Sequence, residues 1–217
     1  MEHIHDGDTL QLGIGGMPIA VGFMIADSDL KDIGIHTEMY VYSFMAMTKA
    51  GVFTGMKNPI NRGKQVFTFA LGSQDLYDWI DNNQVLMTAP AEYCNNGYLV
   101  STIPNFISIN NAVNIDLFGQ INAETAGPRQ ISGTGGQIDF VHGASLSPGG
   151  MSIIAMSSTH YNKKLGKEES RILPTLPQGT AITDPRSKVQ YVATEYGMVN
   201  LMGKSLWQRA EALISIA

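Results

Sequence analysis

The chain has 217 residues and a formal net charge of -5, with 44% apolar and 15% charged residues. This composition excludes a disordered tail or a coiled coil, and the length is enough for a real hydrophobic core. The negative charge argues against a nucleic-acid-binding protein, because phosphate neutralisation needs a basic face.

Cysteine content and hydropathy exclude further classes of protein. The one cysteine, Cys94, cannot form a disulfide framework or a cysteine-based metal cluster, and we expect no metal site. No apolar run is long enough to span a bilayer, and residues 1–8 lack the basic and apolar regions of a signal peptide. We therefore expect a soluble, cytoplasmic protein that contacts neither membrane nor nucleic acid.

In the first half of the chain, short apolar runs alternate with helical patterns. Residues 9–14 are predicted to form a strand that ends in a glycine turn. A helix from Pro18 to Leu30 follows, because a proline in the first turn loses no hydrogen bond. Ser73 is a suitable N-cap for a later helix. The other elements expected here are a strand over 34–38, a helix ending at Ala50 and a strand over 66–71.

The second half is predicted to hold extended segments over 106–109, 113–117, 152–156, 181–183 and 191–194. A last helix begins at Ser205, where Gln208 completes a capping-box pattern. Its apolar spacing continues to Ala217 with no glycine or asparagine cap, so we expect the natural protein to extend further. Strands alternating with helices indicate an α/β fold with an open, largely parallel sheet and flanking helices.

Two glycine-rich segments are able to bring backbone N–H groups close to a ligand. Residues 13–17 lie between a predicted strand and a predicted helix, a place that suits a phosphate or a developing oxyanion. A dinucleotide fingerprint would need glycine where Pro18 stands, and a purely structural turn is an equal alternative. Residues 132–136 offer a second set of donors, which a β-bulge or bend explains equally well.

Polar residues mark other candidate positions. Glu38 ends the predicted strand 34–38, where open α/β folds place their ligands, and His36 shares its face. From the residues alone, side chains satisfied by local hydrogen bonds are the favoured alternative. The basic run 162–171 could hold the phosphates of a nucleotide-like cofactor, or form a solvated loop. For Cys94, a buried structural role is favoured over nucleophilic catalysis.

Six segments, each weak alone, together resemble the C-terminal half of the acetyl-CoA hydrolase/transferase family, a branch of the class I CoA-transferases. The segments occur in family order across essentially the whole chain, at 6–16, 34–39, 108–110, 116–120, 132–140 and 194–197. The resemblance implies a CoA-transferase fold of the NagB/RpiA-like type. It also implies that residues 1–217 are a C-terminal catalytic domain. The N-terminal domain that faces it and the extreme C-terminus would be absent from this sequence, and the protein would form a homo-oligomer.

The resemblance implies a particular chemistry. Glu38 matches the family's catalytic glutamate, which attacks an acyl-CoA thioester and becomes a glutamyl-CoA thioester. An acceptor acid then reverses the steps, so CoA passes in ping-pong fashion between short-chain acids such as acetate, butyrate or 4-hydroxybutyrate. Coenzyme A enters as a substrate, in the form of acyl-CoA. The alternatives are an acyl-CoA hydrolase, and a CoA-binding or assembly module that is inactive without its N-terminal half.

The resemblance also assigns supporting residues. Asn95 and Glu195 match family residues that position the reactive carboxylate. Lys163 or Lys164 is the expected contact for a CoA phosphate, although the match to the family is loose there. The positions matched to oxyanion stabilisation or CoA binding are Gly13, Ile14, Gly15, Gly16, Met17, Ser132, Gly135, Gly136 and Lys163.

Overall fold

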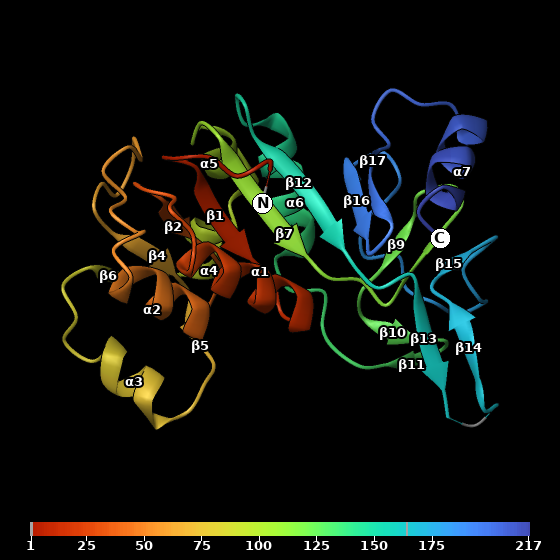
Figure 1. The fold of residues 1–217 in the computed structure, drawn as a ribbon, viewed down its shortest axis with the longest axis horizontal. Coiled ribbons are helices and arrows are strands. Elements are labelled where there is room, and N and C mark those ends of the chain that lie inside the picture. Colours follow the sequence, from red (N-terminus) through yellow and green to blue (C-terminus); the bar gives the residue numbers. More distant parts are fainter. Residues whose placement is uncertain (1, 164) are drawn as a thin grey trace.

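A computed structural model describes residues 2–163 and 165–217 and is built around one eight-stranded sheet (Figure 1). The strand order is β17-β16-β12-β7-β1-β2-β4-β6, and neighbours are parallel except for the antiparallel pair β16–β17. This arrangement confirms the predicted α/β class with an open, largely parallel sheet. The strands are β1 Thr9–Leu12, β2 Gly34–His36, β4 Gln65–Phe67, β6 Leu86–Thr88, β7 Phe106–Asn110, β12 Met151–Ala155, β16 Tyr191–Thr194 and β17 Gly197–Asn200.

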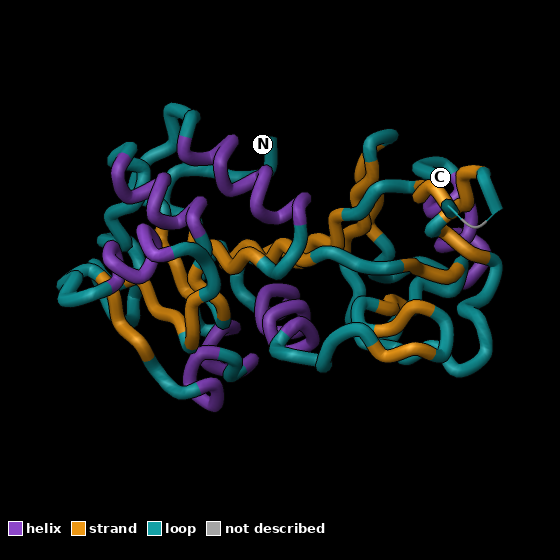
Figure 2. The backbone as a smooth tube through the Cα atoms, turned by 90° about the horizontal axis from the view of Figure 1, so that it is seen from below, coloured by secondary structure: helices purple, strands orange, loops and turns teal. Residues whose placement is uncertain are grey.

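Helices cover both faces of this sheet. In Figure 2, α1 and α2 lie on one side of the strands and α6 on the other. The chain moves from β1 to β2 in one direction and from β7 to β12 in the other, so right-handed crossovers place the connecting helices on opposite faces. The helices are α1 Gly16–Ala26, α2 Tyr42–Lys49, α3 Gln74–Ile80, α4 Ala91–Cys94, α5 Gly97–Ser101, α6 Gln137–Leu146 and α7 Leu206–Ile214.

Smaller sheets gather at the end of the molecule beyond β12 and β16 (Figure 1). They are β15-β8-β9, the hairpin β10-β11 and the hairpin β13-β14, while β3 and β5 pair beside β2 and β4. Their bounds are β3 Met39–Tyr40, β5 Phe69–Ala70, β8 Asn114–Asp116, β9 Ile121–Asn122, β10 Thr125–Ala126, β11 Arg129–Gln130, β13 Thr159–Asn162, β14 Lys167–Ser170 and β15 Ile172–Leu173.

The main hydrophobic core lies between the sheet and the pair α1–α2. Leu10 and Ile35 of the sheet and Phe44 of α2 are fully buried in it. Each such side chain contributes about 1.5–3 kcal/mol by leaving water. A second cluster includes Leu213 of α7, and a third includes Phe140 of α6. No helix in the described part of the chain is long and apolar enough to cross a bilayer.

Two expected strands are wrong, because one is interrupted and the other does not form. The strand expected over 66–71 is interrupted at Thr68, because the N–H groups of Thr68 and Phe69 both donate to the carbonyl oxygen of Glu38, at 2.9 and 3.2 Å. The remainder forms β5, which pairs with β3 rather than extending the main sheet. Residues 181–183 form no strand; there the backbone meets Ile121 through a single bridge at Asp184.

The helix expectations need smaller corrections. Helix α1 begins at Gly16 and ends at Ala26, so Pro18 lies in its first turn as predicted, but the helix stops four residues before Leu30. The capping box predicted at Ser205 is present, with both reciprocal bonds to Gln208, although α7 itself ends at Ile214.

Candidate functional site

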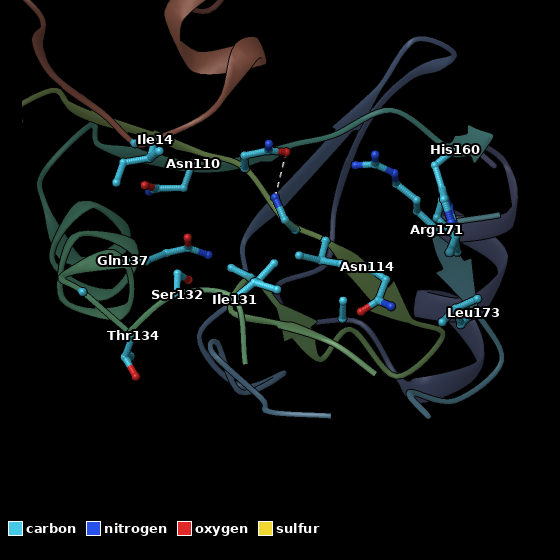
Figure 3. Close-up of a pocket in the computed structure, with 18 of the residues that line it drawn as sticks. Ile14, Asn110, Asn114, Ile131, Ser132, Thr134, Gln137, His160, Arg171 and Leu173 are labelled. Carbon is cyan, nitrogen blue, oxygen red and sulfur yellow. Dashed lines mark hydrogen bonds between the residues drawn. The ribbon is translucent and has the colours of Figure 1, made fainter. Parts of the chain in front are cut away.

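A cavity of about 1100 Å³ opens at the carboxyl ends of β1, β2 and β7. The sheet order reverses between β1 and β7, and open α/β sheets bind their ligands at such a switch point. Figure 3 shows Ile14, Asn110 and Gln137 on one side of this cavity and His160 and Arg171 on the other. The volume suits a large organic ligand.

Glu38 contributes a half-buried carboxylate to the wall of this cavity. It follows the end of β2, and both of its carboxylate oxygens are held. Oε1 accepts from Asn95 Nδ2 at 3.0 Å, and Oε2 accepts from the backbone N–H of Gly136 at 2.9 Å. Because Thr68 and Phe69 also bond its carbonyl oxygen, the backbone and the side chain of Glu38 are both oriented.

Gly136 is the N-cap of α6, so the Glu38 carboxylate lies at the N-terminal end of a ten-residue helix. The aligned peptide dipoles favour negative charge at that end. A Cβ on Gly136 would stand 2.3 Å from Asn95 Nδ2 and 3.0 Å from Glu38 Oε2. Only glycine therefore allows both partners to approach. Gly135, at φ +58°, and Ser132 line the same cavity.

Asn95 is held next to Glu38 by a neighbouring histidine. His36 is fully buried and donates from Nε2 to the carbonyl oxygen of Cys94 at 2.8 Å. Burial lowers the pKa of His36, so the ring is neutral at pH 7 and fixes the chain position of Asn95. Cys94 is buried too, and burial raises the pKa of its thiol, as its predicted structural role requires.

Only the first part of the glycine turn after β1 lines the cavity. Gly13 and Ile14 line it, whereas Gly15, Gly16 and Met17 begin α1 outside the lining. A Cβ on Gly13 would stand 2.3 Å from Asn110 Oδ1. Close packing of β7 against the turn therefore explains this glycine directly.

A buried amide network that the sequence did not indicate lies below this turn. Gln11 Nε2 donates to Asn110 Oδ1 at 3.0 Å, and Asn110 Nδ2 donates to Gln11 Oε1 at 3.1 Å. Ser108 Oγ completes the set by donating to Gln11 Oε1 at 2.6 Å. The alternation of Gln11 and Leu12 in an apolar strand was the available signal, but the partners are about a hundred residues apart in the chain and become neighbours only through β1–β7 pairing.

In the basic run 162–171, the cations that line the cavity differ from the lysine that the resemblance indicated. Lys163 lies exposed in the turn between β13 and β14 and does not line the cavity, and Lys164 lies outside the described residues. The cations of this segment that do line it are Lys167 and Arg171. In Figure 3 the Arg171 side chain reaches into the cavity from the side of His160.

Glu195, unlike Glu38, does not line the cavity. It is exposed in the turn between β16 and β17, where its carboxylate accepts from Ser158 N at 2.9 Å and Ser158 Oγ at 2.8 Å. Its own backbone N–H and these bonds from Ser158 lower the pKa of Glu195. Within residues 2–163 and 165–217, no three His, Cys, Asp or Glu side chains gather as metal ligands would.

Comparison with known proteins places this geometry in context. The chain matches the acetyl-CoA hydrolase/transferase C-terminal domain over residues 72–217. The butyryl-CoA:acetate CoA-transferase of Anaerostipes caccae is 56% identical over 100% of this chain and 48% of its own length. RipA from Yersinia pestis has a TM-score of 0.92 at 38% identity, covering 100% of this chain and 47% of that one.

A further structure, the 4-hydroxybutyrate CoA-transferase of Porphyromonas gingivalis, has a TM-score of 0.82 at 42% identity, covering 100% of this chain and 49% of that one. It supports the predicted CoA-transferase fold. An acetyl-CoA hydrolase of Kluyveromyces lactis is more distant, at 25% identity over 98% of this chain and 38% of its own length. The chain spans about half the length of the curated relatives it matches.

Proposed function

This chain belongs to the acetyl-CoA hydrolase/transferase family, and on that premise we propose that it is the C-terminal catalytic domain of an acyl-CoA:carboxylate CoA-transferase. The proposal rests above all on the Glu38 carboxylate, which faces a large cavity with both oxygens oriented by Asn95 and Gly136. A carboxylate is already ionised at neutral pH, so it can act as a nucleophile without a general base.

In the first half-reaction, Glu38 attacks the thioester carbonyl of an acyl-CoA. The tetrahedral intermediate expels CoA thiolate and leaves an acyl-glutamyl anhydride. The thiolate then attacks the glutamyl carbonyl, which releases the first acid as its carboxylate and leaves Glu38 as a glutamyl-CoA thioester. Charge and atoms balance, since one carboxylate enters the reaction as Glu38 and one leaves as free acid.

In the second half-reaction, an acceptor carboxylate attacks the glutamyl thioester and expels CoA thiolate again. The thiolate attacks the acyl carbonyl of the new anhydride, giving the new acyl-CoA and regenerating Glu38. Each addition creates an oxyanion, and a preorganised N–H donor contributes roughly 3–4 kcal/mol to such an intermediate. The proposed donors are the N–H groups of Gly136 and of Ile14, which lines the cavity, because the Gly13 N–H donates to the Ile109 carbonyl oxygen at 2.8 Å and residues 15–17 do not line the cavity.

The rest of the cavity suits the CoA portion of the substrate. CoA carries phosphates, and Lys167 and Arg171 contribute cations to the lining of the same cavity. Binding energy from this remote part of the substrate can orient the reacting thioester. The names of the relatives suggest butyrate, acetate or 4-hydroxybutyrate as acids.

A transferase is favoured over a hydrolase by the relatives. Three relatives named transferases are 46–56% identical to this chain, whereas two acetyl-CoA hydrolases are each 25% identical. Kinetics separate the two, because a transferase requires an acid acceptor and shows ping-pong behaviour. Binding of CoA without a covalent adduct would instead favour a non-catalytic module.

We further propose that the full protein contains an N-terminal domain that closes the cavity and that it assembles as a homo-oligomer. The half-length coverage of the relatives supports the first point.

The decisive experiment is intact-mass spectrometry of the full protein after incubation with butyryl-CoA, followed by peptide mapping. A mass gain of CoA less one water, mapped to Glu38, is expected for the glutamyl thioester. Borohydride reduction of the adduct gives an independent signature of a thioester. No adduct in an enzyme that still turns over butyryl-CoA would overturn the covalent route.

A further inference from the structure

We propose that Gln137 and Asp184 are positioning residues for the transfer reaction, because their partly buried hydrogen bond sets the Gly136 N–H on Glu38. The proposal rests on the function assigned to Glu38 above. It adds two residues, far apart in the chain, that neither the motifs nor the resemblance assigned.

The contact itself joins the start of α6 to the segment that is bonded to Ile121 of β9. Gln137 follows Gly136 directly, lines the cavity and donates from Nε2 to Asp184 Oδ2 at 2.7 Å. The Gly136 N–H is one residue away, on Glu38 Oε2 at 2.9 Å. A movement of Gln137 therefore changes the donor on Glu38 directly.

Asp184 is a fixed point for this contact. It is fully buried, and its backbone is tied to β9 by the bond from Ile121 N to its carbonyl oxygen at 3.0 Å. Its neighbour Thr183 donates to the Ile121 carbonyl oxygen at 2.8 Å. The backbone that carries the acceptor for Gln137 is thus held by its bonds to β9.

The other end of the glycine-rich loop is held in the same region. The carbonyl oxygen of Glu124 accepts from Ile131 N at 2.8 Å and from Ser132 N at 3.3 Å. Residues 132–136 are therefore anchored at their start by Glu124 and just after their end by Asp184. A loop containing three glycines has high backbone freedom, so two anchors are needed to keep its last N–H on target.

Among the residues that the structure describes, those that anchor the loop contain buried carboxylate oxygens without partners, which lowers the stability of the folded protein. Asp184 Oδ1 and Glu124 Oε2 are buried without a hydrogen-bond partner in the described part of the chain. The ion pairs found in the same part of the chain include neither residue. Buried polar groups without partners are uncommon in native proteins and call for an explanation. For Asp184, the bond from Gln137 and the orientation of the loop before it supply one.

The test measures steady-state CoA transfer by the full protein with Gln137→Ala, Asp184→Ala, the double variant and Asp184→Asn. We expect each alanine variant to lower kcat by roughly tenfold to a hundredfold, with the KM for acyl-CoA changed less than about threefold. The double variant should lose little more than either single variant. Asp184→Asn keeps an oxygen acceptor for Gln137 and should restore most of kcat.

Gln120→Ala is the matched control. Gln120 Nε2 donates to the buried Asp116 Oδ2 at 2.6 Å. This is again a glutamine amide bonded to an aspartate carboxylate, but neither residue lines the cavity. This variant should lower stability without lowering kcat. An unchanged kcat in Gln137→Ala, or an Asp184→Asn variant as impaired as Asp184→Ala, would overturn the proposal, as would an equal loss in Gln120→Ala.

Hydrogen–deuterium exchange over residues 133–140 gives a readout that does not depend on turnover. Exchange at Gly136 should speed up in Gln137→Ala and Asp184→Ala but not in Asp184→Asn or Gln120→Ala. If the wild-type protein transfers no CoA, the function of Glu38 fails while this measurement still decides the anchoring. If wild-type transfer is normal and exchange is unaltered by Gln137→Ala, the positioning role fails alone.

Discussion

At the scale of single residues, the Glu38 carboxylate, which is the proposed nucleophile, is oriented through both of its oxygens. Asn95 and Gly136 supply one donor each, and the glycine is required because a Cβ would collide with the asparagine amide. Glu38, Asn95 and Gly136 could be predicted from the sequence through the family resemblance. His36, Gln11 and Asp184 could not be given partners, because those partners come from distant segments.

The first prediction concerns the reach of Glu38. Glu38→Ala should abolish transfer because it removes the nucleophile, and Glu38→Asp should retain only a small fraction because a missing methylene misplaces the attack. Both are measured by CoA transfer and by adduct formation. The exposed Glu2→Ala is a suitable control and should stay fully active. Full activity of Glu38→Ala would refute the mechanism.

A second prediction follows from the burial of Asp184. Burial, with a smaller contribution from Glu124, raises its pKa to about 6 against an opposing hydrogen bond from Gln137. The folded state thus binds the proton more tightly than the unfolded state does. This contribution to stability is complete below about pH 4 and is lost as pH rises through 6, by about 3 kcal/mol in all.

Asp184→Asn removes that titration. The free energy of unfolding of the variant, minus that of wild type, should therefore be clearly larger at pH 8 than at pH 4.5, so the variant gains stability relative to wild type as pH rises. Urea denaturation at the two pH values measures the difference. A difference between variant and wild type that stays constant with pH would contradict the raised pKa.

At the scale of elements, local signals predicted beginnings of elements better than their ends. The capping box at Ser205 was predictable because its two bonds lie within one turn. The break in the strand expected over 66–71 was not, because it is made by the Glu38 carbonyl oxygen, some thirty residues earlier in the chain. Residues 181–183 have strand composition, but the β-bridge next to them joins only Asp184 to Ile121.

The capping box supports a third prediction. Ser205→Ala should lower the free energy of unfolding by about 1 kcal/mol, because it leaves the Gln208 N–H without its side-chain acceptor. Ser215→Ala makes the same chemical change at the other end of α7, where the hydroxyl donates to the Ala212 carbonyl oxygen, and should cost less. Urea denaturation compares the two. Equal losses would mean that the box contributes nothing specific.

At the scale of the whole molecule, the strand order decides where the site lies. Alternation of strands and helices predicted the α/β class, but the placement of β1 beside β7 across the switch point needed the structure. The same holds for the small sheets that bring Lys167 and Arg171 over the cavity while leaving Lys163 outside it. Sequence reasoning identified the basic run, but it did not identify which of its cations line the cavity.

The fourth prediction separates these cations. Arg171→Ala should raise the KM for acyl-CoA roughly tenfold with little change in kcat, because a charge-assisted contact to a phosphate is lost far from the thioester. The rise should shrink at high salt, which screens such contacts. Lys163→Ala is measured beside it. A larger KM effect at Lys163 would return the phosphate contact to the residue matched by resemblance.

The helix end beneath Glu38 has a consequence for which acceptor reacts. In the proposed mechanism Glu38 becomes a neutral thioester, and the positive end of α6 then loses the anion that it held. An incoming carboxylate or thiolate can replace that lost charge, whereas a water molecule cannot. We therefore expect the proposed covalent intermediate to react with anionic nucleophiles in preference to water, which favours exchange over hydrolysis.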